Sequence, residues 1–463
     1  MSRVKSFPQI SGGLRLSTFV VVFLIVLALT LFINSDSEFF LVSLYTTIVW
    51  SVYLPIAMVG ILGAVNSRRI KISNYQGLVD KKVIFRIPTV ARMDTIPSLE
   101  RVIKSILINA QRNLLSFRID IIVDEGAAGI EYLQKKYLGN SAVRIIVVPN
   151  GFATENGTLY KARANQYAML LRRREQENTK DVFIYHLDDD TAVGPDTISS
   201  IAEFIDHKKH NFHLAQGILS FPHHLSPSSF CKLADSVRPA DDLTRFYFCT
   251  GVLGTPLAGL HGEHLLVKAN VEDEIGWDFG PVKVEDAYFA IRFSEKYPGK
   301  STFLNSYSYG ASPATIGDLI KQRRRWSSGL VSLIFDRSIK GRYKLLLSYC
   351  IANWATGIFH HIGFILLAVY LLGMMNTSPL LQVFLVAWAF NLSYFIWIYM
   401  EGLRINLKNT HPKWFRQNNY TMQTLAVIPF VWPLSAIEGL AGFLGFCDFL
   451  FKKKGFDVIS KKT

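Results

Sequence analysis

The chain has 463 residues, half of them hydrophobic, and a formal net charge of +14. Its apolar residues gather in long uncharged runs near both ends, which is typical of a membrane protein with a soluble middle. Many basic residues flank these runs, for example Arg68, Arg342 and Lys452, so the charge indicates a cytosolic membrane face and not a nucleic-acid groove. The four cysteines lack Cys-x-x-Cys spacing, which argues against a zinc site and a disulfide framework.

Two apolar runs, 16–33 and 39–65, dominate the N-terminal part of the chain. A cleaved signal peptide is the competing interpretation of the first run. However, the run is long for that role, and a second one follows at once. We therefore expect residues 1–66 to form a transmembrane hairpin whose acidic tip, 34–38, faces outward.

The middle of the chain, residues 80–342, alternates strand-like and helix-like patterns of apolar residues. Strands are expected at 82–88, 118–123, 143–148, 182–187 and 213–221, and helices at 96–113, 159–173, 197–206 and, on a weaker pattern, 226–260. Repeated strand–helix units predict an α/β domain whose mostly parallel sheet has helices on both faces. We place this domain in the cytosol.

The remaining residues, 343–463, return to the membrane. Apolar runs at 345–375 and 380–400 are followed by a basic stretch, 404–416, which we expect to be a loop. The last apolar run, 422–450, has basic flanks on both sides and contains two prolines. We therefore expect a re-entrant or interfacial segment broken at the prolines, then a basic cytosolic tail. The whole chain is predicted to be a multi-pass integral membrane protein, of a bacterial plasma membrane or of the ER or Golgi.

Three adjacent carboxylates, Asp188, Asp189 and Asp190, follow the strand expected at 182–187. In an open α/β sheet, ligands bind at the carboxyl ends of the strands. Neighbouring carboxylates repel one another unless a cation offsets their charge, and Mg²⁺ or Mn²⁺ suits such oxygen ligands. The alternative is a solvated acidic turn that caps the next helix.

Two further motifs follow downstream, Glu285-Asp286 and Gln-Arg-Arg-Arg-Trp at 322–326. Taken singly, the acidic pair could mark a helix N-terminus, and the basic motif could be a collar beside the membrane. His261 and His264 are expected to be structural, because two histidines without a third ligand are weak evidence for a metal. The order of the motifs between two membrane regions is far more specific than any one of them.

In this order the motifs resemble those of the family 2 glycosyltransferases, membrane-embedded inverting enzymes that include cellulose, chitin and hyaluronan synthases. The sequence is more closely similar to the egghead-like β-1,4-mannosyltransferases. The stretches that carry the resemblance are 157–164, 186–188, 215–217, 233–236, 278–281, 285–290 and 322–326. It implies a GT-A, Rossmann-like glycosyltransferase domain inserted between N- and C-terminal transmembrane helices.

The resemblance also implies a role for individual residues. Asp188 and Asp190 would bind Mn²⁺ or Mg²⁺, and Asp286, beside Glu285, would be the general base. Contacts with the nucleotide-sugar donor are implied for Asp124, Lys161, Arg163, Asp189, Gln322 and Arg325. Contacts with the acceptor are implied for Trp326 and Gly262.

We therefore expect an inverting transferase that moves a hexose, with mannose from GDP-mannose as the favoured donor, to a lipid-linked or glycan acceptor in β-linkage. A processive polysaccharide synthase that uses a UDP-sugar is the alternative within this class. An alternative of another class is a membrane transporter or scaffold without enzymatic activity. Donor, acceptor and membrane are the expected partners, and nucleic acid is not.

Overall fold

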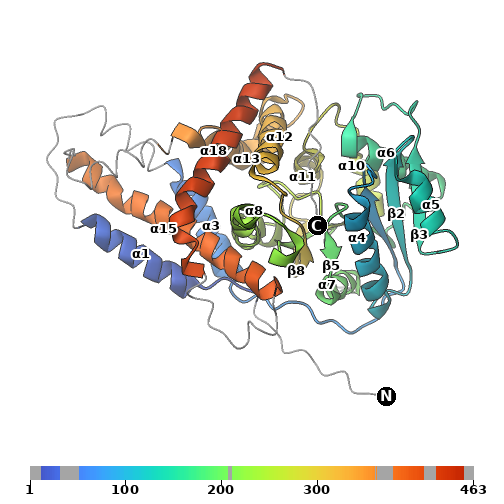
Figure 1. Cartoon of the computed structure of the whole chain (residues 1–463), viewed down its shortest axis with the longest axis horizontal. Helices are drawn as coiled ribbons and strands as arrows, with labels where there is room; N and C mark the ends of the chain where they lie inside the picture. Colours follow the sequence, from blue (N-terminus) through green and yellow to red (C-terminus); the bar gives the residue numbers. More distant parts are fainter. Residues whose placement is uncertain are drawn as a thin grey trace.

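The computed structural model describes residues 12–31, 52–206, 211–359, 361, 379–410 and 424–452. An eight-stranded mixed sheet lies at its centre, with the strand order β3-β2-β1-β4-β7-β6-β8-β5. In Figure 1 the strands β2 and β3 and the helix α5 lie at one end of the molecule, whereas the helices α1 and α15 extend from the other.

Half of the sheet is the parallel unit that the sequence predicts. Its strands are β1 (Lys82–Pro88), β2 (Phe117–Asp124), β3 (Val143–Val148) and β4 (Val182–His186). All four are parallel, and β1 is buried along its centre, as expected of a strand covered on both faces. The carboxyl ends of these strands therefore meet at one edge of the sheet.

The other half of the sheet contains two antiparallel strands, although the sheet as a whole is mostly parallel, as expected. It consists of β5 (Ala192–Val193), β6 (Leu214–Ser220), β7 (Leu265–Lys268) and β8 (Ser301–Tyr309). β7 runs antiparallel to both β4 and β6. Because of this direction, the residues just before β7 lie beside the carboxyl end of β4, where the acidic residues follow.

Helices cover both faces of the sheet, as predicted. They are α4 (Ile96–Asn109), α5 (Ile130–Lys136), α6 (Tyr160–Arg174), α7 (Pro195–Asp206), α10 (Ala269–Ile275) and α11 (Glu285–Lys296). Apolar side chains of α4 and α7 pack in one core cluster with β1 and β2. A second cluster joins α6, α10 and α11 to β4 and β7.

The segment between β6 and β7 is helical, as predicted, but it is unusually wound. It comprises α8 (Ser229–Ala234), a 3₁₀ turn η3 (Asp235–Val237), α9 (Arg238–Asp241) and a π-helix η4 (Asp242–Val252). The helix α3 (Leu54–Ser67) packs directly on it. A Cβ atom on Gly63 would lie 1.8 Å from the Thr244 carbonyl oxygen, so only glycine permits this approach.

The C-terminal part of the chain forms long helices that pack on the sheet domain and on the N-terminal helix. They are α12 (Ile316–Phe335), α13 (Gly341–Ala355), α15 (Pro379–Thr410) and α18 (Ile428–Leu450), with α1 (Leu16–Leu31) from the N-terminal part. α1 packs along α15. The Arg15 Nε lies 2.7 Å from the buried Glu401 carboxylate, which ties the two helices together.

Two expectations about this region are wrong. Residues 404–410 continue α15 instead of forming a loop, and residues 411–416 lie outside the described part. The polar stretch is helical because its side chains have partners. Asn406 Oδ1 accepts from the Phe221 N–H at 2.8 Å, and Arg404 donates to Glu401 at 2.8 Å.

The break that was expected at the prolines of α18 is also absent, because the helix runs through Pro433. Pro429 lies in the first turn, where no N–H donor is needed. The helix is further held by contacts with its neighbours. Glu438 accepts from Arg323 Nε at 2.8 Å, and the Gly442 carbonyl accepts from Ser327 at 2.7 Å.

Among the residues that the structure describes, α18 alone is long and apolar enough to span a membrane. Shorter apolar helical stretches lie at Leu16–Ala28 and Leu54–Ser67. The expected hairpin tip, 34–38, lies outside the described residues. The multi-pass arrangement and the three-part division of the chain remain predictions.

Candidate active site

A cavity of about 930 Å³ begins at the carboxyl ends of β1, β2 and β4 and continues between α12, α13, α15 and α18. Most of the residues that the sequence singled out line it. They are Asp124, Lys161, Asp188, Asp189, Asp190, Gly262, Glu285, Asp286, Gln322, Arg325 and Trp326. Segments far apart in the chain therefore meet in one site.

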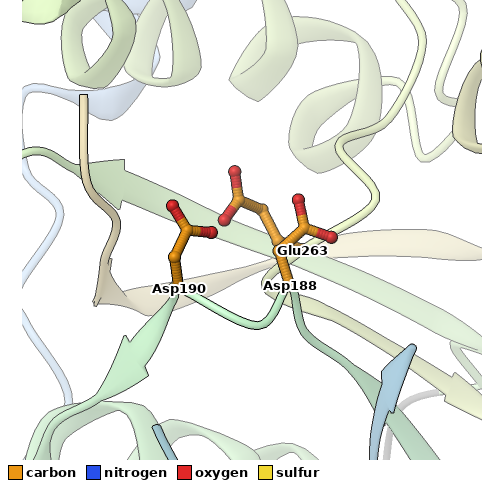
Figure 2. A group of neighbouring side chains, drawn as sticks. All are labelled: Asp188, Asp190 and Glu263. Atoms are coloured by element: carbon orange, nitrogen blue, oxygen red, sulfur yellow. The ribbon is translucent and has the colours of Figure 1, made fainter. Parts of the chain in front are cut away.

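Three carboxylates line this cavity, and Figure 2 shows that they lie close together. One oxygen from each of Asp188, Asp190 and Glu263 lies within 4.8 Å of the others, and Asp190 is buried. Carboxylates so close repel one another without a cation, and three oxygen ligands suit a hard divalent ion such as Mg²⁺ or Mn²⁺. These side chains therefore fit a divalent metal site.

Glu263 was missed by the sequence analysis, which singled out only Gly262 and the two histidines, His261 and His264, in this stretch. Its position follows from the sheet, since it lies just before β7, which is antiparallel to β4. Thr191 donates a hydrogen bond to its carboxylate. The only local signal is an acidic residue shortly before the short apolar stretch 265–267, and this pattern is too common to single out.

Asp189, between the two clustered aspartates, is held by a different contact. Its Oδ2 accepts from Thr89 Oγ1 at 2.6 Å, just after β1. Asp189 still lines the cavity, and it links the acidic loop to the end of the neighbouring strand. A role in donor binding remains a prediction.

Lys161, in the first turn of α6, lies between the acidic groups. Its Nζ donates to Asp188 and to the Gly262 carbonyl oxygen at 2.8 Å, and it lies 3.7 Å from Glu285 Oε1. Burial acts to lower the pKa of Lys161, but Asp188 and Glu285 raise it above its ordinary value. These neighbouring carboxylates therefore favour the charged form of Lys161.

Gly262 lies close to the lysine and the acidic pair. A Cβ atom there would lie 2.7 Å from Lys161 Nζ and 3.4 Å from both Asp286 Oδ2 and Glu285 Oε1. Any larger residue would displace the lysine from its carboxylate partners. Gly262 thus lies between the acidic pair and the lysine.

Glu285 and Asp286 form the first turn of α11. Burial raises the pKa of Glu285, although Lys161 opposes that shift, and the adjacent Asp286 raises it further. Asp286 Oδ1 accepts from the Ala287 N–H at 2.8 Å. The two acidic side chains therefore lie together at the start of α11, with Glu285 next to Lys161.

Asp124 and Arg163 form a pair at the end of β2. Arg163 Nη1 lies 2.6 Å from Asp124 Oδ1, and the same guanidinium donates to the carbonyl oxygens of Pro149 and Phe152. The Asp124 side chain is 60% exposed, so it can accept further hydrogen bonds. Arg163 does not line the cavity, and its contacts orient Asp124.

The Gln-x-x-Arg-Trp motif lies on α12, and its second residue holds the helix in place. Arg323 is buried between Asp235 and Glu438, with Glu438 Oε1 2.8 Å from its Nε. Gln322 Oε1 accepts from Arg323 Nη1 at 2.5 Å. Gln322 is therefore bound to its neighbour, and sequence reasoning had no signal for the role of Arg323.

Trp326 faces the cavity with two guanidinium groups over its ring. The guanidinium carbons of Arg238 and Arg323 lie 4.9 Å and 4.5 Å from the ring centroid. Cation–π contacts of this kind fix the orientation of an indole. Trp326 is thus held in a fixed position on the cavity wall.

His261 and His264 are buried and bonded within the protein, in agreement with the structural role expected for them. His261 Nε2 lies 2.6 Å from Asp242 Oδ1, and His264 Nε2 lies 3.0 Å from the Ser306 carbonyl oxygen. Burial lowers the pKa of His264 to about 4, so its imidazole is neutral near pH 7.

Comparison with known proteins identifies relatives of the chain. A family model described as glycosyl transferase family group 2 matches residues 183–400. The β-1,4-mannosyltransferase egh of Drosophila melanogaster is 29% identical over 246 residues, which cover 52% of this chain and 51% of that protein. The β-1,4-mannosyltransferase bre-3 of Caenorhabditis elegans is 29% identical over 219 residues, 47% of each protein. The chain thus spans about half the length of the curated relatives it matches.

Among solved structures, the mannosyltransferase PcManGT from Pyrobaculum calidifontis, in complex with GDP-Man and Mn²⁺, is similar at a TM-score of 0.48. Its sequence identity is 10%, and the match covers 89% of this chain and 99% of that one. The family model and the curated relatives confirm the predicted resemblance to family 2 glycosyltransferases close to the egghead-like enzymes.

Proposed function

We propose that this chain, similar to the family 2 glycosyltransferases, is an inverting hexosyltransferase that transfers mannose from GDP-mannose to a lipid-linked or glycan acceptor in β-linkage. One observation carries the proposal. The three-carboxylate cluster and the Glu285–Asp286 pair open onto the same cavity, with Lys161 between them. The names of the curated relatives support mannose as the sugar.

The donor side of the reaction would use the groups near the carboxyl end of β4. Asp188, Asp190 and Glu263 would hold Mn²⁺ or Mg²⁺, and the ion would offset the charge of the donor diphosphate. Lys161 adds a second positive charge at the same place, and Arg325 suits bidentate contact with a phosphate.

The remaining predicted donor contacts lie around this centre. Asp124 is exposed at the end of β2 and would accept hydrogen bonds from the nucleoside, with Arg163 orienting it. Asp189 and Gln322 line the same cavity. On the acceptor side, Trp326 would stack on a sugar ring, and Gly262 would leave room beside the reacting groups.

The chemical step would be a single displacement. Asp286 would take the proton from the acceptor hydroxyl while that oxygen forms a bond to the anomeric carbon, and the bond from this carbon to the nucleoside diphosphate would break. One displacement inverts the anomer, so an α-linked donor gives a β-linkage. Proton abstraction by a positioned carboxylate contributes on the order of 10²–10⁴-fold to the rate.

The proposed location is the membrane, with the catalytic site in the cytosol. α18 is apolar and long enough to span a bilayer, and it lines the cavity that contains the catalytic groups. We keep the division into an N-terminal hairpin (1–66), a catalytic domain (80–342) and a C-terminal membrane region (343–463) as part of this proposal.

The test is release of nucleoside diphosphate from a panel of GDP- and UDP-sugars by the detergent-solubilised chain with Mn²⁺. Selective turnover of GDP-mannose that is lost in Asp286→Asn would support the proposal. In addition, Glu263→Gln should raise the Mn²⁺ concentration needed for half-maximal rate. The matched control is Asp181→Asn, at an exposed carboxylate. It should change neither the turnover of GDP-mannose nor the Mn²⁺ concentration needed for half-maximal rate.

Other outcomes would select the alternatives. Turnover of a UDP-sugar into long chains would indicate a processive polysaccharide synthase. No release across the panel, with folded protein and an acceptor present, would refute the enzymatic function and favour a transporter or scaffold.

A further inference from the structure

The wall of the cavity beyond Trp326 carries a stripe of alternating charges. Its members are Asp235, Arg238, Asp241 and Arg245, and all four line the cavity. They are spaced by three or four residues along η3, α9 and η4, and this spacing places them on one helical face. The catalytic mechanism proposed above uses none of them.

Asp241 and Arg245 form the inner end of this stripe. Arg245 Nε lies 3.1 Å from Asp241 Oδ1, and its Nη2 lies 2.5 Å from Oδ2, so the pair is bidentate. Both side chains keep some exposure, 19% and 24%. The guanidinium also lies over the Phe246 ring, 4.9 Å from its centroid. The result is a flat, oriented set of hydrogen-bonding groups facing the cavity.

The backbone that presents this pair is held firmly. Ser67 of α3 donates to the Leu243 carbonyl oxygen at 2.6 Å, and Tyr394 of α15 donates to Thr244 Oγ1 at 3.3 Å. Gly63 allows α3 to touch the backbone at Thr244. Segments of π-helix are rare and frequently occur at functional sites, and this one is fixed by two neighbouring helices.

The charges along this wall cancel. The stripe contributes two acids and two bases, and the pair that contacts it, Arg323 and Glu438, adds one of each. A subsite for a phosphate or another anion would have a surplus of cations. A neutral ligand with many hydroxyl groups suits this wall better, because a hydroxyl can accept a hydrogen bond from the guanidinium and donate one to the carboxylate.

The same cavity is also lined by apolar side chains. They include Ile56 of α3, Ile396 of α15, and Ile428 and Val431 of α18. The cavity therefore offers carboxylates, the charged stripe and hydrocarbon to one ligand. This combination suits a molecule with a hydroxyl-rich head and an apolar chain.

We propose that the Asp241–Arg245 pair is a specificity subsite for the hydroxyl groups of a glycosyl head that is joined to an apolar chain. The inference rests on the proposed function, since a head bound there would direct a hydroxyl of the acceptor toward Asp286. It goes further in assigning recognition of the head to the π-helical segment and not to the catalytic motifs.

The test is a comparison of three probes with the same octyl chain and different heads: octyl β-D-glucoside, octyl tri(ethylene glycol) and octyl phosphate. Binding to the full chain in lipid nanodiscs is measured by calorimetry without donor, with empty nanodiscs subtracted. The wild type should prefer the glucoside to the glycol head on the order of tenfold or more, because the glycol has fewer hydroxyl groups and so makes fewer hydrogen bonds to the charged pair.

The double variant Asp241→Asn/Arg245→Met removes both charges together and should lose most of this preference. Arg245→Lys keeps the charge but not the bidentate geometry and should retain only part of it. Arg342→Met, an exposed arginine on α13, is the matched control and should behave as wild type. The preference is a ratio, so a general loss of folded protein would not change it.

An undiminished preference in the double variant would overturn the proposal, and so would a wild type that has no preference or that favours octyl phosphate. Because the measurement needs no donor and no turnover, it is independent of the test of the proposed function. Selective glucoside binding without any nucleoside diphosphate release would refute the transferase and leave the subsite standing.

Discussion

Replacing Glu272 with glutamine should strongly destabilise the sheet domain. The Glu272 carboxylate is fully buried and joins four elements. Its oxygens lie 2.5 Å from Arg86 Nη1 and 3.1 Å from Arg172 Nη2. They also lie 3.1 Å from His186 Nε2 and accept a hydrogen bond from Trp277 Nε1 at 2.8 Å. Since His186 ends β4, two residues before Asp188, this network supports the strand that presents the metal-binding carboxylates.

The expected magnitude follows from the charges that would lose their partner. Arg172 keeps an ion pair with Asp273, whereas Arg86 has its one ion pair with Glu272 in the described part of the chain. Removing one partner of a buried ion pair costs about 3–5 kcal/mol. For a domain of this size each kcal/mol lowers Tm by about 2–4 °C, so we expect a loss of roughly 6–20 °C.

The effect should not depend on pH between 7 and 5. Burial acts to raise the pKa of Glu272, but Arg86 and His186 hold it well below its usual range. A carboxylate with a depressed pKa stabilises the fold fully at pH values above its pKa in the unfolded chain. This stabilisation is lost only as the pH falls from there toward the pKa in the folded protein. The charge is therefore present throughout this range.

The assay is thermal unfolding in one detergent, at pH 7 and pH 5, followed by tryptophan fluorescence. The control is Asp181→Asn, which breaks an exposed pair with Lys81 and should cost less than about 1 kcal/mol. Adding Arg86→Met to Glu272→Gln should recover stability, because it removes the unpaired cation. A Glu272→Gln variant as stable as the control would refute this reasoning.

Three further predictions follow from the site. Asp286→Asn should lower kcat by about 10²–10⁴-fold and leave the donor dissociation constant unchanged in equilibrium binding, and unimpaired turnover would contradict its role as base. Gly262→Ala should weaken donor binding without unfolding the chain, because the new Cβ would lie 2.7 Å from the neighbouring lysine ammonium. The control is Gly151→Ala, where a Cβ meets open space, and this variant should bind the donor as the wild type does. Stability should decline as pH falls from about 6.5 toward 4, by up to roughly 1.4 kcal/mol per pKa unit for each group, because burial lowers the pKa of His186 and His264 to about 4. A Tm that stays constant between pH 7 and 4.5 would contradict this last prediction.

The parallel half of the sheet could be predicted from the sequence because its signals are local. Each strand from β1 to β4 is a short apolar run, and the helices between them show apolar residues at helical spacing. Their alternation restricts the arrangement to a parallel sheet, and this places Asp124 and Asp188 at the same edge. The acidic pair at Glu285 and the motif ending at Trp326 were recognisable for the same reason, since each is contiguous in the chain.

The structure alone decided which distant residues meet. Glu263 joins Asp188 because β7 runs antiparallel to β4, and no local pattern specifies the direction of a four-residue strand. Residues 404–410 are helical because their polar side chains have partners, since Asn406 accepts from the Phe221 N–H just after β6 and Arg404 donates to Glu401. The Asp241–Arg245 pair faces the cavity because α3 and α15 hold a π-helix in place. Local apolar periodicity determines the elements, but pairing across long stretches of chain depends on packing that only the folded protein contains.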